Sequence, residues 1–178
     1  MNDALAHLTL DTVRRLDKVV ADTSSLIYAM RAGFLIPLTQ TIRIIAPPGV
    51  FDELGERGDV SPAIAAIAHL EESDRVYEGY QVDAQVVVAA DKTGCAVLSD
   101  DLRLLARAAE RGIAGYTVRV MLELMLLRST VDFDTYCRFK RSLSEQVRYA
   151  LPLYVAAEEL HWEIRKETGQ EDRWKPGD

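Results

Sequence analysis

Short apolar runs rich in β-branched residues alternate along the chain with longer segments that repeat apolar positions at helical spacing. The short runs have the length and composition of buried strands and lie at residues 18–21, 41–46, 75–77, 95–98 and 116–118. The helical segments lie at residues 24–31, 50 onward, 63–71, 84–92 and 101–111. Strands that alternate with helices form βαβ units. The pattern therefore predicts an α/β fold, a three-layer α/β/α sandwich with a central parallel sheet.

Beyond residue 119 the pattern is helical throughout. The apolar residues of the last segment recur every three or four positions, at Leu153, Ala157, Leu160 and Ile164, and Gly169 is suited to end that helix. We therefore expect two parts: an α/β domain over residues 1–118 and a helical extension over residues 119–178 that packs on it.

Composition places the chain among ordinary globular proteins. Of its 178 residues, 48% are hydrophobic and 28% charged, which excludes a disordered protein. Two cysteines, Cys95 and Cys137, are too few for a disulfide scaffold or a four-cysteine zinc site. The amino-terminal residues lack the pattern of a signal peptide, and no apolar run reaches about 18 residues. We expect a cytoplasmic protein that makes no contact with a membrane.

The charge balance narrows the functional classes. The chain has 21 basic and 28 acidic residues, a net charge of −7, which argues against a protein that coats nucleic acid. An enzyme that acts on nucleic acid through carboxylates stays open. The segment 119–150 is net basic around Arg138, Lys140, Arg141 and Arg148, a cluster typical of a solvated helix face or of a surface that contacts phosphate.

Carboxylates stand at four successive junctions between a predicted strand and the helix that follows it. Asp22 follows the first strand, Glu53 lies one turn into the next helix, Asp83 opens the helix 84–92, and Asp100-Asp101 follows the strand 95–98. Ser99-Asp100 is suited to cap the helix 101–111. The carboxyl ends of parallel strands share one edge of the sheet, where ligands of α/β proteins bind. We therefore expect these acids to converge.

Any one of these acids alone also suits a helix N-terminus, because an acidic side chain caps N–H groups and complements the helix dipole. Four acids that converge without a basic partner repel one another and raise one another's pKa. A divalent cation removes that conflict, and oxygen ligands without His or Cys select a hard ion such as Mg²⁺ or Mn²⁺. Such a centre suits metal-assisted attack of water on a phosphoryl group.

Other phosphate-binding motifs are absent from the sequence. The first strand is not followed by G-x-G-x-x-G, and no G-x-x-x-x-G-K-[ST] occurs, which argues against a dinucleotide fold and a P-loop. The three histidines, His7, His69 and His161, lie far in sequence from the acidic junctions.

Four segments resemble the motifs of the PIN-domain family, in the same order and strand context. They are Val19-Val20-Ala21-Asp22-Thr23-Ser24-Ser25-Leu26, Val50-Phe51-Asp52-Glu53-Leu54, the helix from Asp83-Ala84-Gln85 to Ala90, and Val97-Leu98-Ser99-Asp100-Asp101-Leu102. The resemblance covers roughly residues 18–118. It implies a PIN-like sandwich and an Mg²⁺- or Mn²⁺-dependent ribonuclease that cuts single-stranded RNA.

The resemblance also implies which residues carry the activity and which partners the chain has. The metal-binding and catalytic set is Asp22, Glu53, Asp83 and Asp101, and the supporting set is Thr23, Ser24, Ser99 and Asp100. The family includes toxins of toxin–antitoxin pairs and many homodimers. We therefore expect a small antitoxin protein and a second copy of the chain as partners.

Two alternatives stay open from the sequence. One is a non-catalytic interaction module that keeps the fold, with the helices over 119–178 as its binding surface. The other is a structure-specific DNA nuclease with the same acidic centre, although the chain offers neither additional acids nor a helical arch for gripping DNA.

Overall fold

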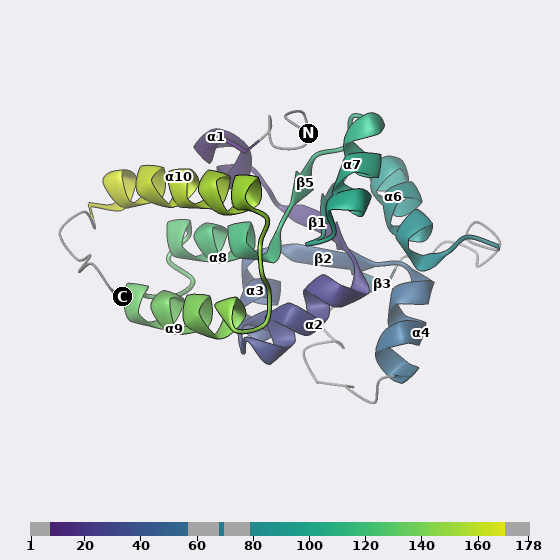
Figure 1. The fold of residues 1–178 in the computed structure, drawn as a ribbon, viewed down its shortest axis with the longest axis horizontal. Coiled ribbons are helices and arrows are strands. Elements are labelled where there is room, and N and C mark those ends of the chain that lie inside the picture. The colour runs from purple at the N-terminus through teal and green to yellow at the C-terminus, as the bar shows by residue number, and fades with distance from the viewer. Residues whose placement is uncertain (1–7, 57–67, 70–78, 170–178) are drawn as a thin grey trace.

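The computed structural model of the chain describes residues 8–56, 68–69 and 79–169, and these form an α/β sheet with helices around it (Figure 1). The sheet has five strands in the order β3-β2-β1-β4-β5, and every neighbouring pair is parallel. The strands are β1 (Lys18–Ala21), β2 (Arg43–Ala46), β3 (Ala68–His69), β4 (Ala96–Leu98) and β5 (Gly115–Tyr116).

Helices cover both faces of this sheet. The chain runs from β1 outward to β2 and β3, then crosses back to β4 and β5, and crossovers between parallel strands are right-handed. The helices that connect β1, β2 and β3 therefore lie on one face of the sheet, and those that connect β3, β4 and β5 lie on the other. Figure 1 shows α2 and α4 on one side and α6 and α7 on the other. Their bounds are α2 (Thr23–Arg31), α3 (Leu35–Thr41), α4 (Pro48–Glu56), α6 (Val82–Thr93) and α7 (Leu102–Glu110). The predicted three-layer sandwich is confirmed.

The remaining helices lie beside the sandwich. They are α1 (Leu10–Arg14), α8 (Val118–Leu127), α9 (Phe133–Ser144) and α10 (Leu151–Thr168). Residues 118–126 of α8 are all buried, which explains why the segment is apolar except at Arg119 and Glu123. Figure 1 shows α8 between α9 and α10. Residues of all three helices belong to the same hydrophobic cluster as the sheet, so the helical part packs on the sandwich through α8.

Most predicted helix ends agree with the structure. Gly94 and Gly169 end α6 and α10 in the left-handed conformation that glycine adopts without strain. None of the helices in the described ranges has the length and apolar character needed to cross a lipid bilayer.

Residues 68–69 differ from their prediction. A helix was expected over residues 63–71, but residues 68–69 form β3, which pairs with β2 in the register Ile45↔Ala68 and Ala46↔His69. The rest of the predicted helix lies outside the described residues. The free edge of β2 supplies backbone partners that the local alanine-rich sequence does not reveal, and tertiary pairing overrides helix propensity. The predicted strand 75–77 lies outside the described residues.

Two strands have bounds that differ by a few residues from those predicted. The run predicted as 116–118 ends at Tyr116, because Thr117 accepts a hydrogen bond from the backbone N–H of Val120 and caps α8. The strand predicted from residue 41 begins at Arg43, because α3 continues through Thr41. The sequence pattern did not indicate α3, which is seven residues long.

One arginine holds the end of α8 to two earlier segments. Arg128 donates hydrogen bonds from Nη1 to the carbonyl of Thr41 at 2.7 Å and from Nη2 to those of Leu16 at 2.7 Å and Arg14 at 3.1 Å. Its planar guanidinium thus satisfies carbonyls at the ends of α1 and α3, which otherwise have no partner within their helices.

Arg128→Lys should lower the free energy of unfolding by about 1–2 kcal/mol, because an ammonium group cannot reach all three carbonyls at once. Urea unfolding followed by circular dichroism measures the change. Arg111→Lys is the matched control, because Arg111 lies exposed at the end of α7 and makes no side-chain hydrogen bond within the described ranges. Equal effects of the two substitutions would contradict the assigned role of Arg128.

Candidate functional site

The candidate site lies where the direction of the chain across the sheet reverses. β1 pairs with β2 on one side and with β4 on the other, with Ala21 opposite Leu98 at the carboxyl ends. The connections that leave β1 and β4 run in opposite directions, which opens a crevice between them at the edge where ligands of α/β proteins bind. Asp22 directly follows β1, and Ser99 and Asp100 directly follow β4.

Asp22 is buried at the amino end of α2 and acts as its N-cap. Its Oδ1 accepts a hydrogen bond from the backbone N–H of Ser25 at 2.7 Å. Its Oδ2 accepts from the hydroxyls of Ser99 at 2.5 Å and Ser24 at 3.1 Å. Burial raises the pKa of the Asp22 carboxyl, although these hydrogen bonds act to lower it. The side chain is therefore held rigidly in a place that disfavours its charge.

Asp100 lies next to Asp22 and shares a serine with it. Its Oδ1 accepts from the backbone N–H of Val118 at 3.2 Å, and its Oδ2 accepts from the hydroxyl of Ser25 at 3.4 Å. Burial, followed by the negative charge of Asp22, raises the pKa of Asp100 to about 7. The two acids thus repel each other across Ser25, and no Lys or Arg in the described part of the chain pairs with either.

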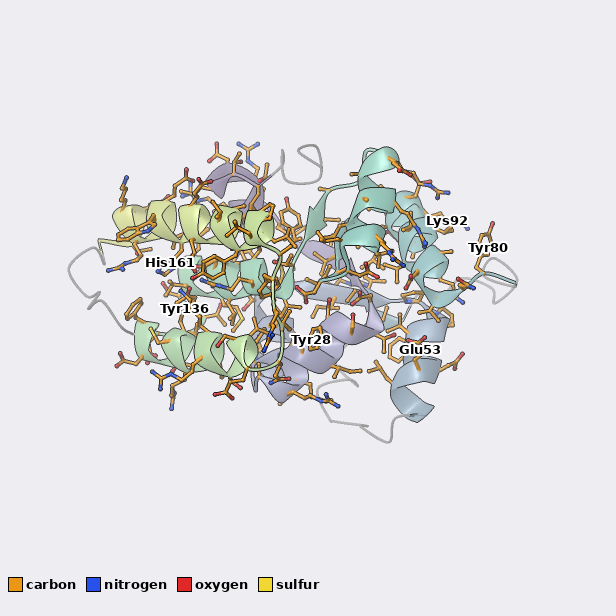
Figure 2. The ribbon with its side chains drawn as sticks, in the orientation of Figure 1. Tyr28, Glu53, Tyr80, Lys92, Tyr136 and His161 are labelled. Atoms are coloured by element: carbon orange, nitrogen blue, oxygen red, sulfur yellow. The ribbon has the colours of Figure 1, made fainter. Side chains whose placement is uncertain are left out.

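Glu53 is brought to the same place by a residue of α2. The hydroxyl of Thr23 donates to Oε2 of Glu53 at 2.5 Å, which ties the middle of α4 to the first turn of α2. Figure 2 shows Glu53 on α4 close to the amino end of α2. Because Thr23 follows Asp22 directly, Glu53 contacts the residue next to Asp22 in the first turn of α2.

Asp83 is placed differently from the other predicted ligands. Gln81, rather than Asp83, is the N-cap of α6, and Asp83 occupies the first turn with half of its side chain exposed. Its Oδ2 lies 3.8 Å from Nη1 of Arg107 on α7, a contact between two exposed groups. No contact with Asp22, Glu53 or Asp100 is formed.

Asp101 caps α7. Its Oδ1 accepts from the backbone N–H of Arg103 at 2.7 Å, and its own N–H donates to the hydroxyl of Ser99 at 3.0 Å. The prediction that Ser99-Asp100 caps this helix is wrong by one residue. Because Asp101 is the cap, Asp100 is left to point into the crevice.

The donors around the crevice are of the kind that a hard divalent ion prefers. Asp22 and Asp100 lie together at the amino end of α2, Glu53 contacts Thr23 there, and hydroxyls of Thr23, Ser24, Ser25 and Ser99 surround them. All are oxygen ligands, and the repulsion between Asp22 and Asp100 is the kind that a cation relieves. Within the described ranges, no three Asp, Glu, His or Cys side chains lie close enough together to hold an ion as they stand.

Sequence analysis missed the role of Gln85. This side chain is buried on α6, accepts from the backbone N–H of Gly49 at 3.0 Å and donates to the carbonyl of Tyr80 at 3.2 Å. A Cβ atom at Gly49 would lie 2.9 Å from the Gln85 amide, so the start of α4 approaches α6 closely only with glycine. A polar residue inside the apolar run of α6 was the available signal.

Tyr149 was also missed, and no signal in the sequence pointed to it. Its hydroxyl is buried, and burial together with the nearby charge of Asp100 raises the pKa of Tyr149 above its usual range. The residue lies between α9 and α10, so the helical extension reaches the acidic crevice.

A scan of protein-family models finds no match to the chain, and a search of curated proteins finds none either. Among solved structures the chain is similar to a PilT N-terminus domain protein from the hyperthermophilic archaeon Sulfolobus solfataricus P2. The two are 13% identical, and the match covers 65% of this chain and 94% of that chain with a TM-score of 0.45.

Asp100→Asn should stabilise the metal-free protein at pH 8. The pKa of Asp100 rises on folding from its ordinary 3.8 to about 7, so folding favours the protonated carboxyl. The contribution of Asp100 to the free energy of unfolding is complete below about pH 4 and is lost as the pH rises through about 7. Asn resembles the neutral form. The stability advantage of the variant should therefore grow from pH 5 to pH 8 and reach on the order of 2 kcal/mol.

Urea unfolding in EDTA across this pH range measures the effect. Asp101→Asn is the matched control, because Asn caps a helix about as well as Asp does, and its pH profile should follow the wild type. A profile for Asp100→Asn that parallels the wild type would show that Asp100 titrates normally.

Proposed function

We propose that the chain is a divalent-metal-dependent nuclease that hydrolyses phosphodiester bonds of single-stranded RNA. One observation carries the proposal: Asp22, which is buried, and Asp100, which is partly buried, lie together at the crevice between β1 and β4, and no Lys or Arg of the described residues pairs with either. A protein that only folds gains nothing from this arrangement, since two like charges shielded from water oppose folding. The resemblance of the four acidic motifs to the PIN-domain family supports the same function.

Asp22, Asp100 and Glu53 would hold the ion in this proposal. Asp100 takes the place that the motif comparison gave to Asp101, because Asp101 is engaged as the cap of α7. Asp83 can join only after its contact with Arg107 opens. A carboxylate ligand must also be deprotonated, and ion binding would supply the free energy that ionises Asp100.

A bound Mg²⁺ or Mn²⁺ ion supplies an activated water and neutralises charge that develops on the phosphate. The protein's own residues fix the geometry. The hydroxyls of Ser24 and Ser99 hold Oδ2 of Asp22, while the N–H of Ser25 holds Oδ1, so this carboxylate cannot rotate freely. Thr23 restrains Glu53 in the same way. Such supporting hydrogen bonds orient the carboxylate oxygens that would bind the ion.

Substrate and partners rest on the resemblance of the motifs. They are single-stranded RNA as substrate, a small antitoxin protein as inhibitor, a second copy of the chain as a homodimer partner, and a cytoplasmic location. Exposed Arg138 and Arg141 on α9 offer phosphate contacts of the kind that position RNA.

A non-catalytic interaction module is the second candidate, and one observation favours it. Two of the four predicted ligands already have other contacts, Asp83 with Arg107 and Asp101 with the N–H of Arg103. Such a module needs no ion in the crevice, so metal binding separates the two functions.

Mn²⁺ should bind to the wild type and bind at least about a hundredfold more weakly to Asp22→Asn and Asp100→Asn, because each substitution removes a charged oxygen ligand. Isothermal titration calorimetry at pH 8 measures the affinity. Asp101→Asn, the neighbour of Asp100, should bind as the wild type does. Absence of binding to the wild type would favour the interaction module.

The wild type should cleave a single-stranded RNA in the presence of Mn²⁺ at least about a hundredfold faster than Asp22→Asn or Asp100→Asn. Gel analysis of an end-labelled RNA, compared with DNA of the same sequence, measures the rate and the substrate class. Preferred cleavage of DNA would correct the substrate, and equal rates for wild type and both variants would overturn the nuclease.

A further inference from the structure

A second pocket lies between α9 and α10 and shares no residue with the acidic crevice. Its volume is about 350 Å³, and its walls include Phe133, Tyr136, Lys140, Arg141, Tyr154 and His161. Figure 2 shows Tyr136 on α9 and His161 on α10 on the facing sides of these two helices. A volume at the lower end of the range of ligand pockets fits one small molecule.

Two wall residues of this pocket, Tyr136 and His161, belong to a buried polar network around Glu123 of α8. Glu123 is fully buried, and its Oε1 accepts from a guanidinium N–H of Arg119 and from the hydroxyl of Tyr136 at 2.7 Å. Its Oε2 lies 2.8 Å from Nδ1 of His161. The rings of Tyr136 and His161 stack with centroids 5.3 Å apart and planes 6° apart. Each wall residue in the network is therefore fixed before any ligand arrives.

The contact with Glu123 also sets the chemistry of His161. A carboxylate only accepts, so Nδ1 carries the proton, and a neutral imidazole then presents Nε2 as an acceptor. In the described part of the chain only Nδ1 of His161 has hydrogen-bond partners. His161, which lines the pocket, thus presents Nε2 for a hydrogen bond with a ligand.

The charges around the pocket leave a surplus of positive charge. Arg119 contacts both Glu123 and Glu158, and Nζ of Lys140 lies 3.0 Å from Oε1 of Glu158. The two carboxylates are thus already paired with cations. Arg141, exposed at the rim, forms no ion pair within the described ranges. In a chain with a net charge of −7, this cationic rim favours an anion locally.

Aromatic rings form the rest of the wall. Tyr154 is 49% exposed and Trp162 is 44% exposed, a high value for large rings beside a pocket. Arg165 is fully buried. Its guanidinium lies 5.2 Å from the ring centre of Trp162 and 5.6 Å from that of Phe133, and these cation–π contacts fix the Trp162 ring. Accessible rings next to cations are what a stacked base with a phosphate requires.

We propose that the pocket between α9 and α10 binds a nucleoside monophosphate. The base stacks on Tyr154, the phosphate contacts Arg141, and Nε2 of His161 forms a hydrogen bond with the ligand. The proposal does not depend on the acidic crevice, which supplies none of these residues.

Calorimetry with the full chain in EDTA tests the proposal, with AMP, adenosine and inorganic phosphate as probes. AMP should bind at least about tenfold more tightly than adenosine or phosphate, since only AMP engages both the rings and Arg141. Arg141→Gln should weaken AMP binding by about tenfold and leave adenosine binding unchanged. Tyr154→Leu should weaken both AMP and adenosine.

Arg138→Gln is the matched control, because Arg138 lies on the same helix but outside this pocket and donates to the hydroxyl of Thr135. It should bind AMP as the wild type does. The double variant Asp22→Asn, Asp100→Asn should also retain AMP binding, which separates this pocket from the crevice. No binding of AMP, equal losses for Arg141→Gln and Arg138→Gln, or loss of binding in the double variant would each overturn the proposal.

Discussion

The repulsion between the buried carboxylate of Asp22 and the partly buried carboxylate of Asp100 is the constraint around which the candidate site is organised. Asp22 and Asp100 meet because β1 and β4 are neighbours in the sheet while the chain leaves them in opposite directions. Serine hydroxyls and backbone N–H groups hold both acids in place, but none of these donors cancels a full charge. The fold therefore keeps a local conflict that lowers its own stability, and such conflicts are typical of sites that act on a ligand.

The helical extension also buries a carboxylate, that of Glu123, but pairs it with a cation and with hydrogen-bond donors. Around Glu123, each carboxylate oxygen has a partner, and Arg119 links this network to Glu158 and Lys140. Tyr149 lies between the two regions, since both Asp100 and Arg119 act on its pKa. The helical extension is thus part of the structure around the site, because Tyr149 lies between the acidic crevice and Arg119 of the network around Glu123.

The sequence predicted the sheet well wherever a strand is buried on both faces. A continuous apolar run such as 18–21 has few alternatives, and it forms β1 with the predicted bounds. Prediction was wrong for residues 68–69, where an edge pairing with β2 decides the conformation, and it missed α3, which is short. Both depend on partners that are distant in sequence and leave no periodic pattern.

The sequence by itself determined that acids stand at the carboxyl ends of the strands, because strand order along the chain places every junction on one edge of a parallel sheet. Only the tertiary structure decided which of these acids meet. Asp100 and Asp101 are adjacent and chemically identical, yet one faces Asp22 and the other caps α7. That choice depends on the start of α7 and on the N–H of Val118 that holds Asp100. Asp83 is likewise directed to Arg107 by the packing of α6 on α7. Side-chain direction at a junction is set by contacts across the fold, and a linear pattern of residues does not contain them.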